Sequence, residues 1–310
     1  MHAMRTAVAV LGMCALLACR PEAPVQVAPT PGHPVSAVQQ LVDDLRRDDL
    51  AAYARHAVPP ALHAQLDTAW REGRTLWPLT ELPLDDRIPN VLAMLAAPDA
   101  PRDLRREFDR QFAGADRDLR ATASTLGLLG VQYVRSEGDY SPSQRAHYAQ
   151  LTAALGRWGS RAPLGDPARG RLHLAALIDA TRNAGLGDDA RWRAQGMHAA
   201  LTRLQPVTRA THRAFDDYGL GIDAALRSVR VTELERSGDT AQVQVDYRLA
   251  GTGIRTEVAM ERIGKRWYLT DVLRAARTEA AGEPSPALDP SPPGAMPPPR
   301  ATQAPEPPQS

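Results

Sequence analysis

Apolar residues recur three and four positions apart through most of residues 36–220. This spacing places them on one face of a helix, so it predicts a series of short amphipathic helices. The residues that we expect to be buried are Val38, Leu41, Val42 and Leu45; Leu50, Tyr53, Ala54 and Ala57; Leu62, Leu66, Ala69 and Trp70; Ile88, Val91, Leu92 and Leu95; Leu104, Phe108 and Phe112; Tyr148, Leu151, Leu155 and Trp158; Leu174, Leu177 and Ile178; Trp192, Leu201 and Leu204; and Phe215 and Tyr218.

Capping residues indicate where several of these helices begin and end. Ser36 is a plausible cap for the first, and Pro59-Pro60 separates the second from the third. Ser141-Pro142-Ser143-Gln144 has the form of a capping box with proline in the first turn. Asp166-Pro167 opens the next helix, and Pro206 is expected to end a later one.

The pattern changes to strict alternation near residue 228. Apolar residues at 241, 243, 245, 247 and 249 alternate with polar ones, and residues 254–260 repeat the pattern after Gly251-Thr252-Gly253. With residues 229–231 before and Tyr268, Thr270 and Val272 after, four antiparallel strands in a meander are predicted. Val243, Val245 and Tyr247 should face the helices; Gln242, Gln244 and Asp246 should face water. The fold class is therefore α+β, with a mostly helical N-terminal two-thirds packed against a C-terminal sheet.

This order of elements, with the run Gly-Lys-Arg-Trp-Tyr-Leu-Thr-Asp-Val at 264–272, resembles the nuclear-transport-factor-2-like (ketosteroid-isomerase-like) cone fold. The resemblance covers residues 34–75 and 226–277. It implies a sheet-lined pocket, in which isomerases and hydratases of the superfamily use an Asp or a His for proton transfer. The helices between the two parts are either an insertion in a cone or a separate domain.

Three residues would lie on the strands of such a pocket: Asp246, Tyr247 and Asp271. Asp246 is opposite in phase to Val245 and Tyr247, so it should face solvent. The side that Asp271 faces is open. On a strand it would lie on the opposite side from Thr270 and Val272 but on the same side as Trp267 and Leu269. Neither carboxylate is assigned a catalytic role.

The N-terminus has the three parts of an export signal. Arg5 precedes an uncharged, mostly apolar run from Ala7 to Ala18, which is too short to cross a bilayer because a membrane helix needs about 20 residues. Leu16-Leu17-Ala18-Cys19 then resembles the bacterial lipobox. The resemblance implies cleavage before Cys19 and attachment of acyl chains such as palmitate to its thiol. The alternative is an ordinary secretory peptide with a chance cysteine.

The chain has two cysteines, Cys14 and Cys19. Cleavage before Cys19 leaves one, so the mature protein would hold no internal disulfide. We expect a location in the bacterial cell envelope, lipid-anchored and facing the periplasm. By analogy with enterobacterial sorting, Arg20 in place of Asp favours the outer membrane.

Proline divides the remainder of the chain. Residues 20–34 contain five prolines and residues 279–310 contain eleven, with few large apolar side chains, which indicates disorder. The predicted organisation is a signal peptide (1–18), a lipidated tether (19–34), a helical region (35–225), a sheet region (226–278) and a tail (279–310). The tether would lift the domain off the membrane.

Composition and motifs identify no reaction. The chain has 37 basic and 36 acidic residues without a basic stripe, which argues against nucleic-acid binding. The adjacent acids Asp43-Asp44, Asp48-Asp49, Asp85-Asp86, Asp188-Asp189 and Asp216-Asp217 are interpreted as helix caps and solvated faces rather than a calcium loop. The histidines after the signal are His33, His56, His63, His147, His173, His198 and His212, and they form no metal-ligand motif. No cofactor is implied.

The leading hypothesis is a non-enzymatic envelope lipoprotein that binds a protein partner or a small apolar ligand. The alternatives are a cone-fold enzyme with acid–base chemistry in the sheet's pocket and a purely structural spacer. A deep cavity with one buried carboxylate would favour the enzyme. A filled core with an exposed apolar patch would favour partner binding.

Overall fold

The computed structural model describes residues 32–81, 87–137 and 140–282. Its helices are α3 (Pro34–Arg46), α4 (Leu50–Ala57), α5 (Pro60–Arg71), η1 (Leu79–Glu81), α6 (Ile88–Ala96), α7 (Ala100–Gln111), α8 (Asp116–Ser136), α9 (Pro142–Gly159), α10 (Pro167–Ala184), α11 (Asp189–Ala194), α12 (Met197–Asp217), α13 (Ile222–Arg227) and α14 (Thr270–Ala281). Its strands are β1 (Arg230–Ser237), β2 (Thr240–Leu249), β3 (Thr252–Ile263) and β4 (Arg266–Leu269). The predicted α+β class is confirmed.

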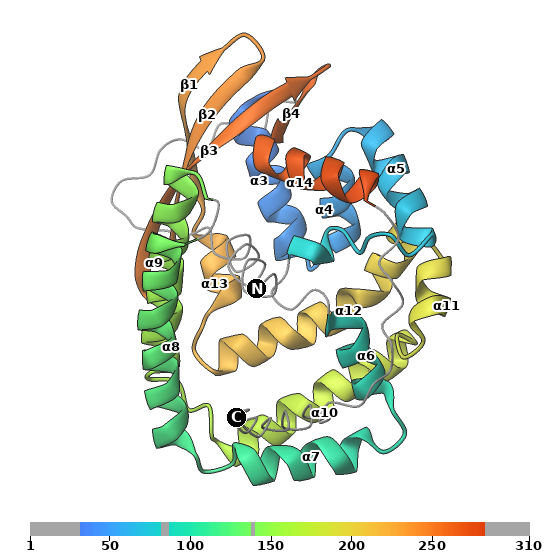
Figure 1. The fold of residues 1–310 in the computed structure, drawn as a ribbon, viewed down its shortest axis with the longest axis vertical. Coiled ribbons are helices and arrows are strands. Elements are labelled where there is room, and N and C mark those ends of the chain that lie inside the picture. Colours follow the sequence, from blue (N-terminus) through green and yellow to red (C-terminus); the bar gives the residue numbers. More distant parts are fainter. Residues whose placement is uncertain (1–31, 82–86, 138–139, 283–310) are drawn as a thin grey trace, which may run out of the picture.

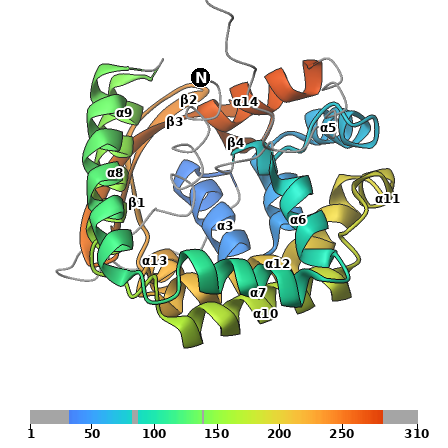
Figure 2. The same cartoon turned by 60° about the horizontal axis from the view of Figure 1, so that its bottom comes forward.

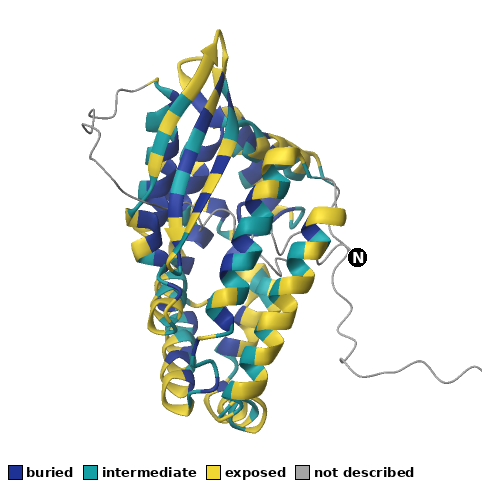
Figure 3. Ribbon diagram, turned by 90° about the vertical axis from the view of Figure 1, so that its left-hand side faces the viewer, coloured by how far each residue is buried: buried dark blue, intermediate teal, exposed yellow. Residues whose placement is uncertain are grey.

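The four strands form one antiparallel meander in the order β1-β2-β3-β4. Buried and exposed residues alternate along β2 and most of β3, as the colours in Figure 3 show. Val243, Val245 and Tyr247 are fully buried, whereas Gln242 is exposed and Gln244 and Asp246 are half-buried. The predicted register of β2 is therefore confirmed.

Helices cover the apolar face of this sheet. α3 contacts β1, β2 and β4, α13 contacts β2, and α14 contacts β3 and β4 (Figure 1). The predicted faces of α3 and α5 are buried as expected, because Val38, Leu41, Leu62, Leu66 and their neighbours in each set lie in the main core. One core thus joins the first helices of the chain to its last strands.

α9 protects the edge of β3. β4 pairs with β3 only between Met260 and Ile263, so the earlier part of β3 has no strand on the side opposite β2. There the side-chain amide of Gln150 replaces a strand: its Nε2–H donates to the carbonyl of Arg255 (3.0 Å) and its Oε1 accepts from the Arg255 N–H (3.2 Å). The backbone N–H and C=O of Arg255, which would otherwise be open for pairing at this edge, are thereby satisfied.

The lower part of the molecule is a helical layer. α10 packs against both α7 and α12, and Figure 2 shows the three helices side by side below α3 and α6. Two of the predicted helix starts are confirmed. Ser141 and Gln144 form a capping box on α9, and the Asp166 side chain accepts from two backbone N–H groups at the start of α10.

Several boundaries were predicted wrongly. α3 begins at Pro34 with His33 as its cap residue, so Ser36 lies inside the helix. Pro206 lies within α12 instead of ending it, because buried residues on both sides keep the helix packed. Thr270 and Val272 belong to α14, not to a fourth strand. The residues in that helix that become buried are Leu273 and Ala276, at helical spacing.

Three residues assigned to buried faces are exposed. Val91 in α6 is 42% exposed, Phe112, just after α7, is 40% exposed, and Phe215 in α12 is 38% exposed. α6 buries only Leu92 and Leu95. α7 ends at Gln111, so Phe112 does not continue the face on which Leu104 and Phe108 lie.

Candidate functional site

The predicted lipid attachment residue, Cys19, lies outside the described residues, as do the adjacent acids Asp85 and Asp86. In the part of the chain that is described, no helix combines the length and the hydropathy needed to cross a bilayer. The first described residue, Gly32, is tied to the sheet: the indole N–H of Trp267 in β4 donates to its carbonyl at 2.9 Å. This hydrogen bond holds the start of the described chain against β4, just before α3 begins at Pro34.

The covered face of the sheet is packed with side chains. Val243, Val245 and Tyr247 are each 0% exposed there. The Tyr247 hydroxyl lies 2.5 Å from Nε2 of His147, which reaches this face from α9. Burial lowers the pKa of His147 to about 4, so the imidazole is neutral near pH 7. The neutral imidazole and the phenol share a hydrogen bond, and both side chains lie within the core.

The two strand carboxylates considered as pocket residues lie elsewhere. Asp246 is on the outer face of the sheet, where Arg255 Nε–H donates to it at 2.6 Å. This agrees with the phase predicted for Asp246. Asp271 lies in the first turn of α14, where it accepts from Gln144 Nε2–H at 2.7 Å and from Arg274. Neither carboxylate faces the covered side of the sheet beside Tyr247.

The adjacent acids have two different roles. Asp49 and Asp188 cap α4 and α11 as predicted, since each side chain accepts from a backbone N–H in the first turn. Asp44 is not on a solvated face: it is 0% exposed. Its carboxylate lies 2.6 Å from both Nδ1 of His56 and a guanidinium nitrogen of Arg47. A buried charge needs such partners to be tolerated.

Other histidines also pair singly with carboxylates. His212 Nδ1 lies 2.7 Å from Asp48, and His173 Nε2 lies 2.9 Å from Asp217. These pairs join α12 to the turn after α3 and to α10. Within residues 32–81, 87–137 and 140–282, no three His, Cys, Asp or Glu side chains gather as metal ligands would.

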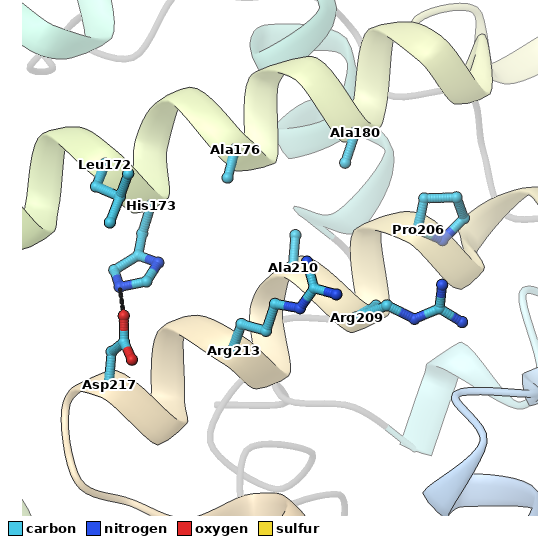
Figure 4. A pocket seen from close by; sticks show the side chains of 9 residues that line it. All are labelled: Leu172, His173, Ala176, Ala180, Pro206, Arg209, Ala210, Arg213 and Asp217. Atoms are coloured by element: carbon cyan, nitrogen blue, oxygen red, sulfur yellow. Dashed lines mark ion pairs between the residues drawn. The ribbon is translucent and has the colours of Figure 1, made fainter.

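An open groove of about 550 Å³ lies between α10 and α12 (Figure 4). Small side chains leave this space: Ala176 and Ala180 point from α10, and Ala210 points from α12. Pro206 adds to it from α12. The polar side chains on the groove are His173, Arg209, Arg213 and Asp217. Sequence reasoning missed this groove because its walls are far apart along the chain.

A second surface is the outer side of α8. Its residues Leu126, Leu128 and Leu129 are 62%, 73% and 55% exposed. They lie within residues 121–134, a stretch without a charged side chain. The one extensive contact of α8 in the described structure is with α9. We call the exposed Leu126, Leu128 and Leu129 with Val131 the α8 face.

Glycines bring α8 and α9 together. A Cβ on Gly127 would lie 2.7 Å from the Cα of Gly156, so the backbones of the two helices touch there. Along the seam between them is a shallow groove of about 500 Å³, lined by Leu128, Val131 and Arg135 of α8 and Ala153 of α9, among others. The uncharged run 121–134 was the sequence signal that could have revealed this surface.

Comparisons with protein-family models, with curated proteins and with solved structures find no match to this chain.

Proposed function

We propose that this protein is a non-enzymatic lipoprotein of the bacterial envelope that docks a helix of an envelope protein on the α8 face. The observation that carries the proposal is the exposure of three leucines within the charge-free stretch 121–134 of α8. Large exposed apolar patches are uncommon on soluble domains and typically mark interaction sites. The filled interior of the sheet argues against the cone-fold enzyme, because Asp246 and Asp271 lie away from its covered face. The buried carboxylate of Asp44 is already paired with His56 and Arg47.

The form of the α8 face favours a helix as the occupant. A seam between two helices that lie side by side, as α8 and α9 do, accepts the apolar stripe of a third helix. The anchor residues of that helix lie at i, i+3 and i+7. Arg135 lines one end of the seam and forms no ion pair among the described residues. A complementary helix would therefore carry an acidic side chain at that end.

A bilayer is a less suitable occupant of the same face. Helices that lie on membranes carry Lys or Arg along their polar side and bury large apolar residues. The α8 stretch 121–134 has no basic residue, and Thr122, Ser124 and Thr125 precede its leucines. Attachment to the membrane is instead supplied by acyl chains on Cys19, as the lipobox resemblance implies.

The cone-fold resemblance remains part of the proposal. A curved four-stranded meander packed against α3 supports it (Figure 2). On this interpretation α6 to α12 form an insertion that supplies the docking helix. The structural-spacer alternative is favoured only by the proline-rich ends of the chain.

Site-specific photo-crosslinking in cells tests the docking surface. A photoreactive residue at Leu128 of the full chain should give one discrete adduct, whose linked peptide is a helix of another envelope protein. The matched position is Leu234 in β1, which is also apolar and 48% exposed, and it should give no such adduct. A synthetic peptide of the linked segment should bind the purified protein, and Leu128→Asp, which places a charge in the seam, should weaken that binding about tenfold or more.

The other outcomes decide against the proposal. An adduct of twice the chain's own mass would assign the α8 face to self-association, and a lipid adduct would assign it to the bilayer. Equal crosslinking from Leu128 and Leu234, or none from either, would exclude the surface as a docking site.

A further inference from the structure

The groove between α10 and α12 combines an apolar base with a local excess of positive charge. Ala176, Ala180 and Ala210 supply the apolar base, and Leu172 extends it at one end (Figure 4). This composition is that of ligand pockets generally, in which a few polar groups orient an apolar body. The volume of about 550 Å³ lies within the range of small-molecule sites.

The charges on the groove do not cancel. Asp217 is the one carboxylate among its lining residues, and it faces His173 at 2.9 Å. Arg213, one helical turn before Asp217, is not paired with it and forms no ion pair among the described residues. Figure 4 shows the Arg213 guanidinium between the two helices, above the base of the groove.

Arg209 adds a second, partly compensated charge. Its Nε lies 3.3 Å from Asp48, whose other oxygen lies 2.7 Å from Nδ1 of His212. The Asp48 carboxylate thus serves two basic side chains, of which Arg209 lines the groove. Arginine offers several N–H donors in a plane, so a guanidinium that keeps free donors is suited to binding a carboxylate or a phosphate.

From this arrangement we infer that the groove binds an anionic amphiphile, a carboxylate or phosphate monoester with a short apolar chain. Arg213 binds the anionic head group and Arg209 assists it. The chain lies along Ala176, Ala180 and Ala210. The inference is independent of docking at the α8 face, since the two surfaces share no lining residue.

Calorimetric titration of the lipid-free chain from residue 20 onward tests the inference, because that chain lacks only the signal peptide and Cys19 and keeps every described residue. The probes are octanoate and octyl phosphate, with acetate and octanol as the separate head and chain. Both octyl anions should bind, whereas acetate and octanol should bind at least about tenfold more weakly. The tighter of the two octyl anions identifies the head group.

Two variants separate the charge from the apolar base. Arg213→Gln should weaken octanoate binding about tenfold, because the charge-assisted hydrogen bonds are lost. The matched control is Arg248→Gln, which removes an exposed arginine from β2 and should leave binding unchanged. Ala176→Leu fills the groove and should reduce octanoate binding to the level of acetate.

The unfolding temperature of each variant is measured to check that the fold is retained. Arg213→Lys, which keeps the positive charge, should bind octanoate more tightly than Arg213→Gln does. The inference is overturned if Arg213→Gln and Arg248→Gln bind octanoate equally. It is also overturned if octanol binds as tightly as octanoate, or if neither octyl anion binds.

Discussion

At the scale of single residues, the sheet offers a sharp contrast between neighbours on β2. Val245 is 0% exposed and faces the helices, whereas Gln242 is exposed on the other side. Val245→Asp should lower the free energy of unfolding by about 3 kcal/mol or more, because it buries a charge without a partner. Gln242→Asp should change it by about 0.5 kcal/mol. Urea unfolding of both variants measures the difference, and equal losses would contradict the register.

Gln242 is a better control here than Gln244. The Gln244 amide donates to Asp246 at 2.5 Å, and Asp246 also pairs with Arg255. A carboxylate at position 244 would lose this hydrogen bond and face a second carboxylate. The alternation of apolar and polar residues in the sequence shows which side of the sheet a residue faces. It does not show which side chains that residue contacts on that side.

His147 should make the free energy of unfolding fall as the solution becomes more acidic. Its pKa is lowered by burial to about 4 in the folded protein, from 6.5 in the unfolded chain. The stabilisation from keeping it neutral is complete above pH 6.5 and is lost as the pH falls toward 4. His147→Gln should therefore reduce the proton uptake on unfolding in this window by about one proton.

Urea unfolding of His147→Gln over this pH window, beside wild type, measures that change in slope. The matched variant is His198→Gln, which alters an exposed histidine. An equal change of slope in both variants would show that His147 is not the group responsible.

At the scale of elements, the α8–α9 pair depends on its glycines. Gly127→Ala places a methyl carbon 2.7 Å from the Gly156 Cα, so the helices must separate. The expected loss is about 1–3 kcal/mol from overpacking, reduced by a gain of about 1 kcal/mol in helix propensity. Ser124→Ala, on the exposed side of α8, should not destabilise. Thermal unfolding compares the two, and a stabilised Gly127→Ala would refute the close contact.

The elements were predictable where a long, regular period was present. The alternation at 241–249 gives β2, and the capping box at Ser141 gives the start of α9. Short windows were ambiguous: Thr270 and Val272 fit a period of two, although α14 buries Leu273 and Ala276 at a period near 3.6. Pro206 misled because tertiary packing of α12 outweighs the loss of one backbone hydrogen bond.

At the scale of the whole molecule, the position of the C-terminal boundary matters. The predicted domain end at 278 falls inside α14, whose last turn is bound by the segment after α5. Arg74 donates to the carbonyls of Ala280 and Gly282, and Thr75 donates to Glu279 at 2.5 Å. Truncation after Gly282 should leave stability unchanged, whereas truncation after Thr278 should cost about 1–3 kcal/mol. Chemical unfolding of both chains tests this, and equal stability would show that the last turn contributes nothing.

Membrane attachment should depend on one thiol. Cys19→Ala should abolish acylation and cleavage, because the lipid is transferred to sulfur before the peptidase acts. Mass spectrometry of the wild-type N-terminus should give a chain that starts at Cys19 and carries acyl mass. A different first residue, or Cys19 without lipid, would contradict the lipoprotein assignment.

The two candidate surfaces needed the whole fold to become visible. The α10–α12 groove joins Ala176 to Arg213 across two helices, and no spacing in the sequence relates them. The α8 face is exposed because no other described element packs extensively over it, and a sequence pattern does not show which elements pack together. The sequence carries a partial sign of it, the uncharged stretch 121–134.

The attachment of Gly32 to Trp267 has a mechanical consequence. A pull from the membrane would enter the domain at Gly32, where the backbone continues into α3 and the Trp267 hydrogen bond ties it to β4. A partner held on α8 would resist the pull through α9 and the Gln150 amide on β3. Between these two points the β4–β3 ladder has four residue pairs, fewer than either other ladder, so it would be the first part of the sheet to open.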